Sequence, residues 1–111
     1  MDKFEAVLLF SPDLTSQNIA KENEDINNII VNFKGILVNI EDWGLRNFSY
    51  NIKNYKKAFY NFYQFEINGD KIADMKKTLT QNEKIIRHLI IKVENHQSLP
   101  TKIKNEEKKT N

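Results

Sequence analysis

With 111 residues, the chain can enclose one hydrophobic core but not two. Its 17 lysine and arginine residues against 15 aspartate and glutamate residues leave a net charge of +2, so any nucleic-acid binding must come from local clustering of cations. Cysteine is absent, which excludes disulfides and thiolate chemistry, and no apolar run approaches the roughly 20 residues that a membrane helix needs.

The N-terminal third predicts a strand followed by an amphipathic helix. Phe4 to Phe10 first alternates large apolar residues and then continues as an apolar run through Leu9, which is typical of a covered strand. Ser11-Pro12-Asp13 ends it because proline lacks an amide donor. Thr15 or Ser16 can cap the helix that follows. We expect Gly35 to end this helix in the left-handed conformation. The apolar residues that share one helical stripe are Ile19, Ile26, Ile29, Ile30 and Phe33.

The middle of the chain predicts two long strands that pair as a hairpin. Residues 36–40 are mostly β-branched and apolar, and an apolar alternation resumes at Phe48, so Gly44 marks a bulge or bend within one strand. Residues 51–57 are polar and basic and should form the turn. Residues 58–67 form the second strand, which is dense in aromatic side chains.

The last third predicts a short helix, a strand and a tail. Asn68-Gly69-Asp70 can cap a helix with Ile72, Met75 and Leu79 on one face, and residues 85–93 form an apolar strand. We expect residues 1–95 to be one domain. Residues 96–111, rich in lysine and glutamate, have the composition of a flexible tail.

This order of elements predicts an α+β fold of the ferredoxin-like, split βαβ type (βαββαβ), with a four-stranded antiparallel sheet and two helices on one face. Gln64 and Glu66 are costly to bury, so their side of the aromatic strand should be the open face. Tyr60 and Phe62 share that side and should be partly exposed. We predict that both bind a partner protein, because the pattern of an aromatic base-stacking platform is missing.

Catalysis is not indicated by the reactive side chains. His88 and His96 have no nucleophile or orienting carboxylate at a telling spacing. Glu41 and Asp42 are adjacent on a strand, so they point to opposite faces and cannot share a metal or a proton. We therefore expect no enzymatic activity, no metal and no cofactor.

Basic residues gather at the predicted hairpin turn. Arg46, Lys53, Lys56 and Lys57 lie close to aromatic residues, a mixture that suits RNA because cations bind phosphates and rings stack on unpaired bases. A solvated hairpin end above core aromatics explains the same residues, and this alternative stays open. A smaller basic group on the last strand includes Arg87.

Residues 41–53, Glu-Asp-Trp-Gly-Leu-Arg-Asn-Phe-Ser-Tyr-Asn-Ile-Lys, resemble the signature of the bacterial-type small-subunit ribosomal protein six family. The likeness extends over residues 3–94, including Ser11–Leu14, Lys57–Tyr60 and Asn82–Leu89. Two residues depart from the family pattern. Phe48 stands where the family usually has leucine, and Asn51 stands where many members carry proline, which loosens the bend of the strand.

The resemblance implies a structural constituent of the small ribosomal subunit, in a bacterial cytoplasm or an organelle matrix. It implies binding of small-subunit, 16S-type rRNA in the central domain, or platform, with ribosomal protein eighteen of the same subunit as a heterodimeric partner. No membrane partner and no small-molecule substrate are expected. The residues expected to contact RNA are Arg46, Tyr50, Lys53, Lys56, Lys57 and Arg87.

Two other functions use the same architecture. A ferredoxin-like regulatory or dimerisation domain would bind a small molecule or a partner protein, but it gives no reason for the signature segment. An acylphosphatase-like enzyme needs a glycine-rich anion-binding loop after the first strand, where Ser11–Leu14 places a carboxylate instead.

Overall fold

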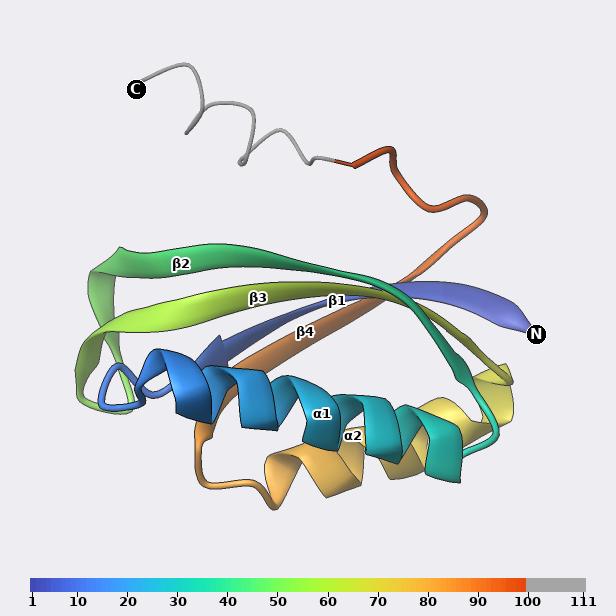
Figure 1. Ribbon diagram of the computed structural model, residues 1–111, viewed down its shortest axis with the longest axis horizontal. Helices are drawn as coiled ribbons and strands as arrows, with labels where there is room; N and C mark the ends of the chain where they lie inside the picture. The colour runs from blue at the N-terminus through green and yellow to red at the C-terminus, as the bar shows by residue number, and fades with distance from the viewer. Residues whose placement is uncertain (100–111) are drawn as a thin grey trace.

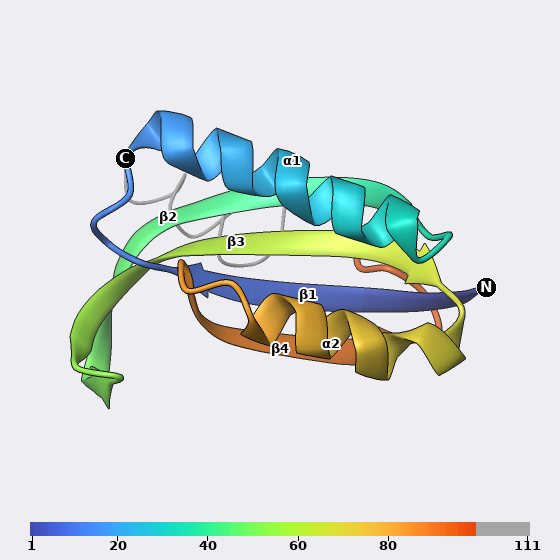
Figure 2. The same ribbon diagram turned by 90° about the horizontal axis from the view of Figure 1, so that it is seen from below.

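The computed structural model describes residues 1–99, apart from the side chains of residues 49–51. Neighbouring strands are antiparallel, and their order in the sheet is β2-β3-β1-β4. Both helices cover the same face of this sheet (Figures 1 and 2). The predicted ferredoxin-like fold is confirmed. The elements are β1 (Asp2–Phe10), α1 (Ser16–Asn32), β2 (Ile36–Ile52), β3 (Tyr55–Ile67), a 3-10 turn (Gly69–Lys71), α2 (Ile72–Thr80) and β4 (Ile85–Val93).

The start of α1 is closed by a reciprocal cap. The Asn18 amide donates to Thr15 Oγ1 and the Thr15 amide donates to Asn18 Oδ1, each over 3.2 Å. Two amides that the helix itself leaves without partners are thereby satisfied. The prediction that Thr15 or Ser16 caps the helix is confirmed for Thr15.

The end of α1 differs from the prediction. Lys34, and not Gly35, adopts the left-handed conformation, with φ of 65°. Its amide donates to the Val31 carbonyl over 2.9 Å, and the Gly35 amide donates to the Ile30 carbonyl over 2.8 Å, the two bonds of a Schellman motif. Glycine is needed at position 35 for space, because a Cβ there would lie 2.6 Å from the Glu66 carbonyl oxygen.

The main core lies between the helices and the sheet. The aromatic strand β3 contributes Tyr63, Phe65 and Ile67, which are almost fully buried. Each buried side chain of this size contributes about 2 kcal/mol through apolar burial. Glu22 of α1 is also buried, and its carboxylate accepts from Asn82 Nδ2 over 2.8 Å. This polar contact ties α1 to the loop between α2 and β4.

Phe62 and Gln64 of β3 lie on the predicted side of the strand, on the sheet face opposite the helices. The prediction that this side of the strand is exposed is wrong for both residues. Phe62 is only 3% exposed, because the Trp43 ring stacks on it with ring centroids 5.2 Å apart. Gln64 is 1% exposed, and its Nε2 donates to Glu5 Oε2 over 2.9 Å. Its Oε1 accepts from Asn39 over 3.0 Å. Burial of Gln64 is tolerated because its polar atoms have partners.

The segment after β4 contributes to this burial. The Gln97 carbonyl accepts from Gln64 Nε2 over 2.8 Å, and the Gln97 amide donates to the buried Glu5 carboxylate over 3.0 Å. His96 Nδ1 lies 3.4 Å from the same carboxylate. The first residues of the predicted tail thus contact the sheet. The proposed division at residue 95 stays a prediction, and residues 100–111 lie outside the described part.

The β2–β3 hairpin is long and curved. Gly44 has φ of 78°, and the register with β3 shifts between Asp42 and Gly44, so the predicted bulge is confirmed. Ile52 pairs with Tyr55. The turn therefore comprises Lys53 and Asn54 alone, with φ of 51° and 70°, as in a two-residue type I′ turn. The predicted turn over residues 51–57 is too long.

Candidate nucleic-acid interface

Three lysines project from the end of the hairpin. Lys53, Lys56 and Lys57 are all exposed. Lys53 lies in the turn, while Lys56 and Lys57 follow on β3, where successive side chains point to opposite faces. The hairpin end therefore presents positive charge at its tip and on both of its sides.

Arg46 is held more firmly than these lysines. It is half-buried, and its Nε donates to the Trp43 carbonyl over 3.0 Å, next to the bulge at Gly44. This hydrogen bond fixes the Arg46 side chain next to the bulge. Tyr50 belongs to β2, but its side chain lies outside the described residues.

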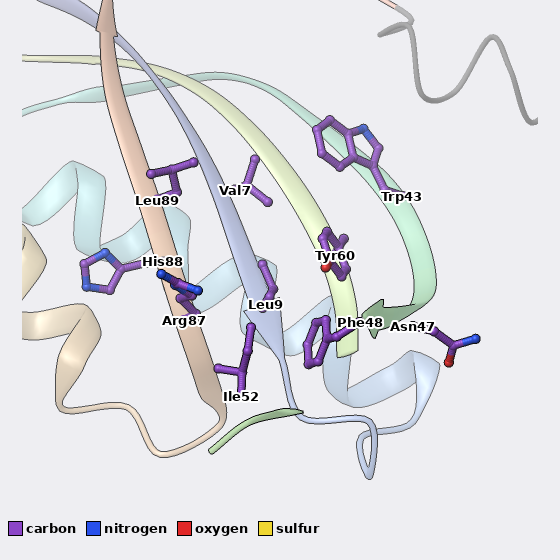
Figure 3. A pocket seen from close by; sticks show the side chains of 10 residues that line it. All are labelled: Val7, Leu9, Trp43, Asn47, Phe48, Ile52, Tyr60, Arg87, His88 and Leu89. Atoms are coloured by element: carbon purple, nitrogen blue, oxygen red, sulfur yellow. The ribbon is translucent and has the colours of Figure 1, made fainter. Parts of the chain in front are cut away.

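Curvature of the hairpin brings its tip to the start of β4. Lys53 lines a hollow of about 250 Å³ together with Arg87 and His88 of β4 and Thr80 of α2. In Figure 3 Ile52, which precedes Lys53, lies below Leu9 and Arg87, and all three line the neighbouring hollow. The fold thus joins the two basic groups that the sequence places 34 residues apart, Lys53 and Arg87.

The pKa of His88 depends on the burial and the charges in this region. Burial lowers the pKa of His88 below its ordinary value, and the positive charges of Lys76 and Lys53 lower it further. Both effects disfavour the protonated form of the ring. Its Nε2 lies 3.4 Å from Thr80 Oγ1.

A larger, mostly apolar hollow of about 490 Å³ lies on the open face of the sheet (Figure 3). Leu89 is 62% exposed at its β4 side, and Tyr60 is half-buried at its hairpin side. Tyr60 is thus partly exposed as predicted, whereas Phe62 lies beneath Trp43. The lining residues are Val7, Leu9, Trp43, Asn47, Phe48, Ile52, Tyr60, Arg87, His88 and Leu89.

The described residues offer binding chemistry, with cations beside an apolar hollow. Within residues 1–99 no group of three or more His, Asp or Glu side chains is placed to hold a metal ion. In the same part of the chain neither helix is both long and apolar enough to span a bilayer.

Sequence reasoning did not single out Lys76 and Thr80. Both are exposed positions on α2, where a lysine or threonine is ordinary. Their nearness to His88 depends on how α2 packs against β4, and no local sequence signal reveals it.

Comparisons with known proteins agree with this fold and with the predicted resemblance. The sequence model of the family Ribosomal protein S6 matches residues 3–92 of the chain. The chain is 35% identical to the small ribosomal subunit protein bS6 of Rickettsia felis over 103 residues, which are 93% of this chain and 85% of that protein. It is 30% identical to the bS6 protein of Geotalea daltonii over 111 residues, covering 96% of this chain and 87% of that protein.

A solved structure shares the architecture. The crystal structure of 30S ribosomal protein S6 from Thermotoga maritima superposes with a TM-score of 0.78 at 20% identity, covering 98% of this chain and 96% of that one. The structural likeness supports the fold, and the family match covers nearly the whole described part of the chain. The chain therefore belongs to the ribosomal protein S6 family.

Proposed function

We propose that this ribosomal protein binds small-subunit rRNA, in the central domain or platform, through the cations at its hairpin end and at the start of β4. The observation that carries the proposal is the convergence of Lys53 and Arg87, with Lys56 and Lys57 exposed nearby on the hairpin. Exposed lysines bind backbone phosphates and position a protein on RNA without reading its sequence.

Ribosomal protein eighteen of the same subunit is the proposed partner. A net charge of +2 attracts RNA only weakly over long range. A more basic partner would supply much of the remaining attraction, while this chain supplies shape. We place the partner on the open-face hollow, because Arg87 lines both this hollow and the basic one. A partner seated there would reach the same RNA.

RNA binding is tested by removing two hairpin charges. Lys56→Gln with Lys57→Gln should weaken binding to a platform rRNA fragment in the presence of the partner, because two phosphate contacts are lost. The salt dependence should fall as well, by up to about 1.4 to 1.8 in the slope of log K against log salt. Fluorescence anisotropy at several salt concentrations measures both quantities.

The control removes two exposed charges elsewhere. Lys21→Gln with Lys34→Gln changes the net charge equally, on and just after α1, far from the hairpin tip in sequence. This control should bind RNA more tightly than the hairpin variant. Equal loss in both variants, or no loss in either, would remove the hairpin from the RNA surface.

Partner binding is tested at the β4 side of the open-face hollow. Leu89→Glu should abolish co-purification of ribosomal protein eighteen, because it puts an unpaired charge into an apolar contact. Val31→Glu is the matched control, since Val31 is 53% exposed on α1 against 62% for Leu89. Undiminished partner recovery with Leu89→Glu would place the partner on another surface.

A further inference from the structure

The small hollow between the hairpin tip and α2 has the composition of an anion site. Its polar lining consists of Lys53, Thr80, Arg87 and His88, which come from the hairpin turn, α2 and β4. Among the described residues that line it, none is acidic. Leu79, Ile85 and Ile86 form an apolar floor that excludes water from one side, which strengthens charge interactions above it.

Lys76 adds a charge from the preceding turn of α2. The Thr80 hydroxyl donates to the Lys76 carbonyl over 2.9 Å, so Thr80 Oγ1 is held in position and can accept from His88 Nε2. The charged groups that act on His88 are Lys76 of α2 and Lys53 of the turn. The residue paired with His88 on β1 is the uncharged Leu8. The charges of two lysines thus act on one imidazole.

We propose that this hollow binds one phosphate group, with Lys53 and Lys76 supplying positive charge, Arg87 supplying a planar donor group and Thr80 orienting the His88 ring. The source would be the backbone of the RNA, so this inference rests on the proposed function and deepens it. A volume of about 250 Å³ is small for a whole ligand, since sites for small molecules span about 300 to 1,000 Å³.

A bound phosphate would change the protonation of His88. The two lysines now disfavour a proton on the ring, and an anion bound in the hollow offsets that repulsion. Phosphate binding therefore raises the pKa of His88 and takes up a proton, so affinity increases as pH falls below 7. Ordinary surface lysines give no such dependence, because they stay protonated throughout this range.

The test follows the ring protons of His88 by NMR through a pH titration of the full chain. Titrations are recorded without ligand, with inorganic phosphate and with the platform rRNA fragment. The RNA should raise the midpoint pH of the His88 titration. Inorganic phosphate at millimolar concentration should raise it to a smaller extent.

Three variants locate the effect. Lys53→Gln and Lys76→Gln should each reduce the midpoint shift of His88, whereas Lys77→Gln, an exposed lysine next along α2, should retain it. A shift with inorganic phosphate but not with RNA would overturn the RNA backbone as the source. An equal shift in all variants would overturn the hollow as the site.

The two proposals can fail separately. If the RNA binds with salt-dependent affinity through Lys56 and Lys57 while the midpoint of His88 stays unchanged, the phosphate site is wrong and the proposed RNA binding stands. If the RNA fails to bind at all, both are wrong.

Discussion

Backbone space, as well as side-chain chemistry, decides which residues this chain accepts at single positions. Gly35 and Lys34 show the two cases side by side. Lys34 carries the strained left-handed conformation, while Gly35 has an ordinary backbone but no room for a side chain. Glycine was correctly linked to the end of α1 from the sequence, but for the wrong reason.

Gly35→Ala should lower the free energy of unfolding by about 1 to 3 kcal/mol, because added volume in a packed site forces the backbone to shift. The new Cβ would meet the Glu66 carbonyl oxygen at 2.6 Å and Ile30 Cγ2 at 2.9 Å. Urea denaturation measures the change. Lys34→Ala is the control and should differ from the parent by less than about 0.5 kcal/mol. A Gly35→Ala protein as stable as this control would contradict the prediction.

At the scale of elements, the hairpin turn combines strain with a charge. Type I′ turns favour asparagine and glycine, because both central residues have positive φ. Asn54 fits this preference, whereas Lys53 does not. A lysine at a position that favours asparagine, next to Arg87 and His88, is consistent with selection for its charge.

Lys53→Asn should therefore stabilise the fold while weakening RNA binding. Relief of left-handed strain should raise the free energy of unfolding by about 0.5 kcal/mol, a fraction of the roughly 1 to 2 kcal/mol that this conformation costs most residues. Lys34→Asn relieves the same kind of strain at the end of α1 and should leave RNA affinity closer to the parent. Thermal denaturation and anisotropy titrations separate the two effects. Tighter or unchanged RNA binding by Lys53→Asn would contradict a role for the Lys53 charge.

At the scale of the whole molecule, one buried amide links segments that are distant in the chain. Gln64 of β3 contacts Asn39 of β2, Glu5 of β1 and Gln97 after β4. Such a network holds the sheet and the following segment together only while each member has its partner.

Gln64→Leu should destabilise the protein by about 2 to 3 kcal/mol, because it removes one donor from the buried Glu5 carboxylate and takes the Gln64 donor away from the Gln97 carbonyl. Gln81→Leu, at an exposed position after α2, is the matched control and should have little effect. Urea denaturation of both variants measures the difference. Equal urea midpoints for Gln64→Leu and Gln81→Leu would show that water replaces the lost amide.

Most of the fold could be predicted from the sequence, but less of the candidate site. The strand boundaries near Phe10 and Ile85, the cap at Thr15 and the bulge at Gly44 were predicted because alternation, capping and glycine act over a few residues. The exposure of Phe62 was predicted wrongly, because Trp43 covers it.

By itself, the sequence determined the order of the elements, the fold class and, through residues 41–53, the family. The element order, the fold class and the family depend on patterns of residues that are close together in the sequence. The tertiary structure alone decided that Lys53 lies beside Arg87 and His88, and that Gln64 is buried. Both outcomes depend on the curvature of a long hairpin and the path of the segment after β4, which are set by packing between segments far apart in the chain.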